Sequence, residues 1–354
     1  MVKIVIIIPF FGEKLPDYFS LYLKSISYNN AVDFMLFTDI KIEENIPPNL
    51  IVNKLNIEEF NILTYKNIGI NPKIVKFYYK LCDLRPLYGK IFQDYILDYN
   101  YWGYGDLDLI YGNLGDFLHK KVNEGYQIIS LRKEWLSGST CLFRNSLEIN
   151  ELYLLSKDWQ KVLSNPNIHY GFDEVSRTKD CKFLYPRLEN GEDLDSIKTE
   201  IDSFTSVVIR NKNKIKTHFE NVICEKLYVD MLLRFSSGDI YVYKKGKGNY
   251  EKNTSFVAFH FVNEKGFKRF RIPNWKEIPD EFKISYFGFH HINENVLWVV
   301  IKRHVRDMII YIPKALVRLV NKIAGKCGEI IYAMNKPFYF CLKRMLKKGK
   351  YSRS

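Results

Sequence analysis

The chain opens with a continuous run of β-branched residues, Ile4–Ile8, that ends at Pro9. A strand with one exposed face alternates apolar and polar residues, whereas a strand covered on both faces is apolar throughout. The run therefore predicts a central strand of a parallel sheet. Helical spacing follows over residues 16–26, and a second buried run, Phe34–Phe37, leads to Asp39. This strand–helix–strand order predicts an α/β fold.

Further apolar runs predict more strands, at Leu50–Leu55, Gln127–Leu131 and Thr140–Phe143. Residues 71–100 and 149–163 have mostly helical spacing. We predict a mixed, mainly parallel sheet flanked by helices over residues 1–288. Residues 187–226 are charged and irregular, which predicts an insertion or a mobile lid. No G-x-G-x-x-G follows the first strand, so the dinucleotide-binding fingerprint is absent.

Two carboxylates, Asp106 and Asp108, follow the aromatic and glycine-rich run Tyr101–Gly105. In an extended chain, residues two apart point to the same side. Two buried carboxylates on one side repel each other and lose hydration, and a bound Mg²⁺ or Mn²⁺ removes both costs. The segment Asp106–Asp108 is therefore either a metal site or a turn with two solvated aspartates.

Three charged residues, Lys80, Asp83 and Arg85, precede that strand within a short segment. One interpretation is an ion-paired helix junction. The other is a binding site, in which Lys80 or Arg85 faces a phosphate and Asp83 faces a base or a ribose.

Three later residues have two interpretations each. Gly138 either lets a ligand approach the backbone closely or makes a bend. Asp173 and Glu174 lie near the start of a predicted helix. There they either cap the helix or act as an acid or base toward a substrate hydroxyl.

Alternating residues predict paired strands at Asp239–Tyr243 and Ser255–Phe261. The second strand carries His260 between two phenylalanines, and a basic loop with Lys265 and Gly266 follows. A single histidine in a strand is either structural or functional. Here the neighbouring loop is suited to receive a diphosphate.

The net charge of +13 is concentrated at the C-terminal end. Residues 296–354 hold 14 of the 53 Lys and Arg residues but two of the 40 acids, so this tail has a net charge of +12 and the rest +1. A nearly neutral body argues against nucleic acid as a partner. The six cysteines show no paired spacing, and the N-terminal apolar run is short for a signal peptide, so we expect a cytoplasmic protein.

Residues 289–354 are predicted to form a basic, amphipathic helical tail. Its apolar residues recur at helical spacing, and basic residues take the other faces; they include Arg303, Arg306, Lys314, Arg318 and Lys322. No stretch has the roughly 18 apolar residues of a spanning helix. The pattern is typical of a segment on an anionic membrane surface, and the alternatives are a helical cap on the domain or a dimer interface.

The order of these motifs resembles the GT-A-type (Rossmann-like) nucleotide-sugar glycosyltransferases. The motifs are Ile4–Pro9, the strand ending at Asp39, Asp106–Asp108, and His260 with Lys265 and Gly266. Over roughly residues 1–275, the chain resembles a bacterial surface-polysaccharide branch of this superfamily. It is distantly similar to the glycogenin and lipopolysaccharide-galactosyltransferase group.

The resemblance implies a role for each matching residue. Pro9, Phe10 and Asp39 would bind the nucleotide. Asp106, Asp108 and His260 would bind Mn²⁺ or Mg²⁺, and Lys265 and Gly266 would bind the diphosphate. The late motif reads His-Phe-Val-Asn-Glu-Lys-Gly-Phe, not His-Phe-x-Gly-x-x-Lys-Pro-Trp, which puts the role of Lys265 in doubt.

The function implied is transfer of a sugar from a nucleotide-diphosphate donor, such as a UDP-sugar, to a hydroxyl of a glycan or lipid-linked acceptor at the inner face of the plasma membrane. If the reaction inverts the anomeric centre, Asp173 or Glu174 is the candidate base. Two alternatives are a metal-dependent nucleotidyltransferase or phosphodiesterase and a non-catalytic membrane-surface adaptor. The sequence leaves donor, acceptor, stereochemistry and oligomeric state open.

Overall fold

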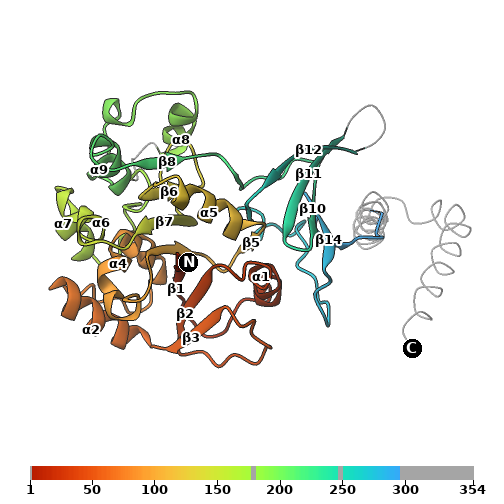
Figure 1. Cartoon of the computed structure of the whole chain (residues 1–354), viewed down its shortest axis with the longest axis horizontal. Helices are drawn as coiled ribbons and strands as arrows, with labels where there is room; N and C mark the ends of the chain where they lie inside the picture. Colours follow the sequence, from red (N-terminus) through yellow and green to blue (C-terminus); the bar gives the residue numbers. More distant parts are fainter. Residues whose placement is uncertain (1, 177–180, 246–249, 296–354) are drawn as a thin grey trace, which may run out of the picture. The chain divides into compact units, whose positions relative to one another are not determined.

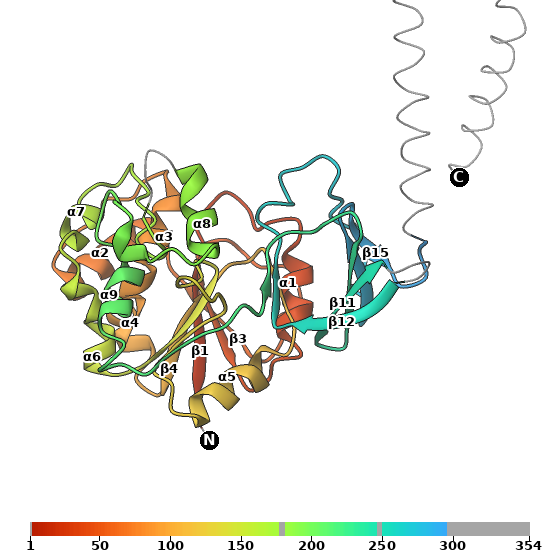
Figure 2. The same ribbon diagram turned by 90° about the horizontal axis from the view of Figure 1, so that it is seen from above.

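The computed structural model describes residues 2–176, 181–245 and 250–295 (Figures 1 and 2). Its largest sheet has seven strands in the order β3-β2-β1-β4-β7-β6-β8. Their bounds are β1 (Ile4–Pro9), β2 (Asp33–Thr38), β3 (Leu50–Lys54), β4 (Tyr101–Gly105), β6 (Ile128–Ser130), β7 (Thr140–Arg144) and β8 (Thr217–Phe219). Strand β7 is antiparallel to both its neighbours, and the other pairs are parallel. The prediction of a mixed, mainly parallel sheet is confirmed.

Helices cover both faces of this sheet (Figure 2). Val5 and Ile7 of β1 lie in one hydrophobic core, and Ile4, Ile6 and Ile8 lie in the other. The first core contains side chains of α2 (Ile57–Ile68), α3 (Leu81–Leu84), α4 (Tyr88–Ile91), α6 (Leu147–Asn150), α7 (Trp159–Leu163) and α9 (Phe204–Arg210). The second contains those of α1 (Phe19–Ile26) and α5 (Leu114–Asn123). Burial on both faces explains why β1 is apolar throughout.

Residues 71–100, predicted to be mostly helical, form a series of short turns. The elements are η1 (Tyr78–Lys80), α3, η2 (Arg85–Leu87), α4 and η3 (Gln93–Tyr95). Pro86 lies within η2, where its ring removes one backbone donor. The series places Lys80, Asp83 and Arg85 on successive turns.

Two smaller sheets complete the described chain. A five-stranded antiparallel sheet has the order β12-β11-β10-β14-β15, and a three-stranded sheet has the order β5-β13-β9. Their bounds are β5 (Leu109–Tyr111), β9 (Ile223–Cys224), β10 (Met231–Ser236), β11 (Asp239–Lys245), β12 (Tyr250–Phe256), β13 (Ala258–His260), β14 (Glu281–Ser285) and β15 (Gly288–His291). The strand predicted at Ser255–Phe261 is therefore wrong as one element. It divides at Val257, and β13 pairs with β5 instead of β11.

Residues 187–226, predicted as an insertion or lid, contain helical elements and two short strands. They include the end of α8 (Cys181–Glu189), η5 (Leu194–Ser196) and α9. They also supply β8 at the edge of the large sheet and β9 beside β13. The insertion or lid stays a prediction.

The chain divides into a unit Met1–Ile292 and a unit Asn293–Ser354. The predicted tail, 289–354, lies outside the described residues from residue 296 onward. In the part of the chain that the structure describes, no helix is long and apolar enough to span a membrane.

Candidate metal centre and active-site cavity

The strand order of the large sheet changes direction between β1 and β4. From β1 the chain continues to β2 and β3 on one side, and it then returns to β4 on the other side. In open α/β sheets, ligands bind beyond the carboxyl ends of the strands at such a switch point. A cavity of about 630 Å³ lies there. It is lined by ten of the predicted site residues: Pro9, Phe10, Arg85, Asp106, Asp108, Gly138, Asp173, Glu174, His260 and Lys265.

Asp106 and Asp108 lie in the bend between β4 and β5, and not within an extended strand. The expectation that an extended chain points both carboxylates to one side is therefore wrong in its geometry. The chain bends because β5 leaves the large sheet and joins the three-stranded sheet. Both residues nevertheless line the cavity.

His260 is brought to this bend by the pairing of β13 with β5. In the antiparallel ladder, His260 lies opposite Leu109. The Phe261 amide donates a hydrogen bond to the carbonyl oxygen of Asp108 at 3.1 Å. The backbone of one segment thus fixes the histidine beside an aspartate about 150 residues earlier in the sequence.

The three side chains place suitable ligand atoms together. His260 Nε2 lies 3.4 Å from Asp108 Oδ1 and 3.8 Å from Asp106 Oδ2. Ligand atoms of the three residues lie within 4.8 Å of one another. The other ring nitrogen, Nδ1, lies 3.3 Å from Glu225 Oε1, which is the carboxylate–histidine arrangement that orients metal ligands.

One buried atom without a hydrogen-bond partner indicates that a cation fits here. Nε2 of His260 is buried and has no hydrogen-bond partner among the described residues, although it faces two carboxylates. An imidazole nitrogen and carboxylate oxygens are ligands for Mn²⁺, and the oxygens also suit Mg²⁺. The residues therefore fit a divalent cation, and their role as ligands remains a prediction.

Cationic side chains also neutralise the aspartates. Lys265 Nζ lies 2.6 Å from Asp108 Oδ2 and donates to the Tyr18 hydroxyl at 3.3 Å. Burial would raise the pKa of Asp108, but His260 and Lys265 lower it well below its ordinary value. Burial would lower the pKa of His260, but the carboxylates of Asp108 and Glu225 raise it to about 10. A cation bound by this imidazole must therefore displace a proton.

Arg85 joins the metal centre to the opposite wall of the cavity. Its guanidinium contacts Asp106 Oδ1 at 2.5 Å and Asp173 Oδ2 at 2.9 Å, and it donates to the carbonyl of Gly138. It also lies over the Tyr104 ring, 5.5 Å from the centroid. Arg85 was predicted to face a phosphate. In the structure it forms ion pairs with two carboxylates and orients them.

Asp173 and Glu174 lie in a turn at residues 172–175, not in the first turn of a helix. The alternative of helix capping is therefore wrong. Glu174 accepts hydrogen bonds from the Gly138 amide at 3.1 Å and the Tyr185 hydroxyl at 2.8 Å. Burial and the neighbouring Asp173 raise the pKa of Glu174 to about 7. A Cβ on Gly138 would lie 2.5 Å from Glu174 Oε1, so glycine permits this contact.

Lys80 and Asp83 form a fully buried ion pair at 2.9 Å and do not line the cavity. Lys80 Nζ also donates to the carbonyls of Val162 and Ile168, and Asp83 accepts from the amides of Tyr170 and Phe172. The ion-paired alternative therefore describes this pair. It fastens the segment that leads to Asp173.

Two predicted nucleotide or diphosphate residues lie elsewhere. Asp39 is exposed and lines a separate hollow of about 530 Å³ with Gly12, Lys14 and Lys41. Gly266 lies in the exposed turn that carries Lys265. Their binding roles remain predictions.

Sequence reasoning missed several residues of the cavity wall, and three of them have polar groups close to the candidate site. His169, Tyr185 and Glu225 all line it. His169 lies four residues before Asp173 in the same short loop, but a single histidine in a loop has no periodic pattern that indicates its role. Tyr185 and Glu225 reach the cavity only through long-range packing, and no local pattern indicates them.

The fold and site define an α/β protein with a candidate cation-binding centre at the switch point of its main sheet. A family model described as a family of unknown function (DUF6625) matches residues 6–293, so the chain belongs to this family. Among solved structures, one that the chain is similar to is the galactosyltransferase LgtC in complex with donor and acceptor sugar analogues. The identity is 11%, the TM-score is 0.27, and the match covers 61% of this chain and 72% of that one. No curated protein matches the chain.

The raised pKa of Glu174 predicts a stabilising substitution. Between its ordinary pKa of 4.5 and the folded value of about 7, the folded chain binds more protons than the unfolded chain, so stability falls as pH rises through this window. We expect Glu174→Gln to raise the free energy of unfolding by roughly 1 to 3 kcal/mol at about pH 8 and by much less at about pH 4. Denaturant unfolding measures this, with the exposed Glu13→Gln as control. Equal effects of Glu174→Gln at both pH values would contradict it.

Proposed function

We propose that the protein is a metal-dependent glycosyltransferase that moves a sugar from a nucleoside-diphosphate donor to an acceptor hydroxyl. One observation carries the proposal: Asp106, Asp108 and His260 converge, from distant segments, on a cavity at the switch point of the sheet. The order of motifs that resembles GT-A-type glycosyltransferases supports it.

The departing group of this reaction is a diphosphate, which develops negative charge. A divalent cation, when bound, neutralises that charge. Lys265 is a cation beside the centre, since its ammonium lies 2.6 Å from Asp108 Oδ2. We assign to it the binding of diphosphate oxygens.

Arg85 and the residues it holds keep the centre in place. It fixes one oxygen each of Asp106 and Asp173, so both carboxylates keep their orientation toward the cavity. Pro9 and Phe10, at the end of β1, line the same cavity and are assigned to the nucleoside, with a UDP-sugar as the proposed donor. Asp39, which lines the neighbouring hollow, is also assigned to the nucleoside.

An acceptor hydroxyl must lose its proton during transfer. Glu174 suits this task better than Asp173, because one oxygen of Asp173 is ion-paired with Arg85. A base whose pKa is about 7 accepts a proton efficiently near neutral pH. We therefore assign Glu174 as the base in an inverting transfer.

The acceptor proposed is a glycan or a lipid-linked saccharide of bacterial surface polysaccharide synthesis. The basic tail, residues 296–354, has a net charge of +12. Each basic residue near an anionic membrane contributes on the order of 1 kcal/mol to binding. We propose that the tail holds the enzyme on the inner face of the membrane, where lipid-linked acceptors lie.

Calorimetry with UDP and Mn²⁺ tests the metal centre. We expect the wild-type chain to bind UDP in the presence of Mn²⁺. Asp108→Asn should weaken this binding at least about tenfold, because it removes a ligand charge but retains the shape of the side chain. The exposed Asp98→Asn is the matched control. Unchanged UDP affinity in Asp108→Asn would count against the proposed function.

Measurement of kcat tests whether Glu174 acts as the base. A panel of sugar nucleotides identifies a donor that the enzyme hydrolyses or transfers. With that donor, Glu174→Gln should lower kcat by about 10²–10⁴-fold, while Glu277→Gln, at an exposed position that lines neither hollow, leaves it unchanged. Wild-type kcat in Glu174→Gln would remove Glu174 from the mechanism.

Membrane binding is tested with the full chain. Arg303, Arg306, Arg318 and Lys322 are replaced together by Gln, which retains the apolar residues of the tail. Since each removed charge costs on the order of 1 kcal/mol, binding to anionic vesicles should fall at least about tenfold. Neutral vesicles are the control in a flotation assay. Equal flotation of both chains with anionic vesicles would reject this role.

A further inference from the structure

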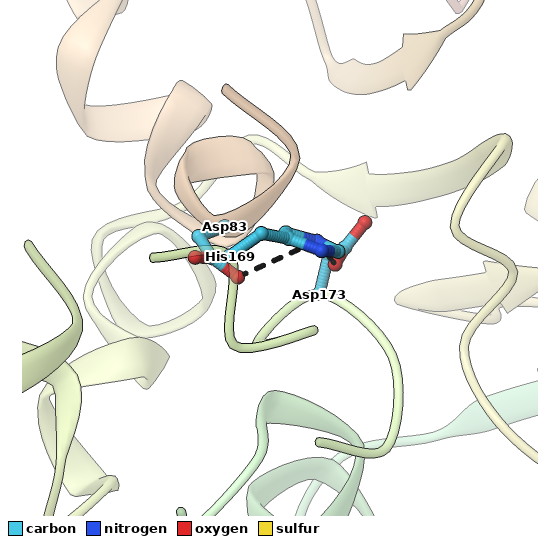
Figure 3. Close-up of side chains that lie close together, drawn as sticks. All are labelled: Asp83, His169 and Asp173. Carbon is cyan, nitrogen blue, oxygen red and sulfur yellow. Dashed lines mark ion pairs between the residues drawn. The ribbon is translucent and has the colours of Figure 1, made fainter. Parts of the chain in front are cut away.

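A second cluster, in which His169 and Asp173 line the cavity and Asp83 lies behind them, has the same composition as the first. Asp83, His169 and Asp173 place ligand atoms within 4.8 Å of one another, and Figure 3 shows the imidazole between the two carboxylates. His169 Nε2 lies 3.7 Å from Asp83 Oδ1 and 3.9 Å from Asp173 Oδ1. The corresponding distances around His260 are 3.4 and 3.8 Å.

The cluster holds buried polar atoms that lack partners. The His169 side chain is 7% exposed and that of Asp173 is 3% exposed. Within the described residues, both ring nitrogens of His169 and Oδ1 of Asp173 have no hydrogen-bond partner. A buried polar atom without a hydrogen-bond partner destabilises the fold, so three in one place indicate a ligand that satisfies them.

The imidazole decides which cation suits the cluster. Lys80 already holds Asp83 Oδ2, and Arg85 holds Asp173 Oδ2. Asp83 Oδ1 also accepts from the Phe172 amide at 2.9 Å, so, among the described residues, the ligand atoms without a partner are Oδ1 of Asp173 and the two ring nitrogens. Imidazole favours borderline cations such as Zn²⁺.

The two distances from the His169 imidazole are close to those in a zinc site. Ligand atoms about 2.1 Å from a tetrahedral zinc lie about 3.4 Å apart, so the observed 3.7 and 3.9 Å require a closure of a few tenths of an ångström. His169 and Asp173 line the cavity, which gives the ion a path of entry. The cavity supplies room for a water ligand.

We propose that Asp83, His169 and Asp173 form a second cation site of the zinc type, separate from the Asp106–Asp108–His260 centre. It binds more weakly than a site with oriented ligands, because His169 Nδ1 has no partner comparable to Glu225 beside His260. Arg85 contacts one aspartate of each site, so the two lie on either side of one guanidinium.

Zinc uptake by the metal-free full chain tests this site. Equilibrium dialysis with Zn²⁺ should give two bound ions per wild-type chain and one in His169→Phe, which retains the ring against Tyr79 but removes both nitrogens. His260→Phe should also retain one ion, and the double variant none. His119→Phe, on α5, is the matched control and should retain two.

A second variant and a second readout guard against misfolding. Asp173→Asn retains the side-chain shape and should also lower the count from two to one, with an unchanged near-ultraviolet circular dichroism spectrum. With Co²⁺ as the probe, His260→Phe should still show the absorption bands of an imidazole-bound ion. One ion per wild-type chain, or two in a folded His169→Phe or Asp173→Asn, would overturn the second site. That outcome leaves the first centre and the proposed function intact, because UDP binding depends on Asp108.

Discussion

The pairing of β5 with β13 is the contact on which the candidate centre depends. It places His260 opposite Leu109 and joins the Phe261 amide to the Asp108 carbonyl. Side chains alternate along a strand, so a shift of one residue in this register would turn the imidazole to the opposite face. The ladder therefore fixes both the distance and the direction of a side chain that comes from the far end of the domain. Glu225, just after β9 on the other side of β13, then orients the ring.

Arg85 performs the corresponding task on the other side of the cavity. Its planar guanidinium has donors in fixed directions, and it uses them for Asp106, Asp173 and the Gly138 carbonyl. A lysine could neutralise these carboxylates but could not hold three groups in one plane. The buried Lys80–Asp83 pair supports the same arrangement from behind, because it binds the backbone of the segment that ends at Asp173. Of the three charged residues predicted to bind a ligand, Arg85 lines the cavity, and Lys80 and Asp83 support its wall.

The sequence predicted the parts of the fold that local pattern determines. The apolar run of β1 and the order of strands and helices identified the class of sheet, and the spacing of Asp106 and Asp108 identified the candidate centre. Pairing between distant strands has no local signal, so the division of Ser255–Phe261 and the assignment of β13 to a separate sheet were missed. The bend at Asp106–Asp108 follows from that same pairing. His169 was missed because a single histidine in a loop has no period to compare with, and its carboxylate neighbours come from two different segments.

The position of Glu174 is difficult to explain by a contribution to the stability of the fold. Burial and the neighbouring Asp173 carboxylate raise the pKa of Glu174 and so oppose its ionisation. The backbone of Gly138 binds Glu174 through its amide and Arg85 through its carbonyl, so one residue holds a carboxylate and a cation apart. Any side chain at Gly138 would close this space. A chain under selection for stability alone would place an apolar residue at position 174. A retained carboxylate whose proton is lost near neutral pH is consistent with a group that exchanges protons with a substrate.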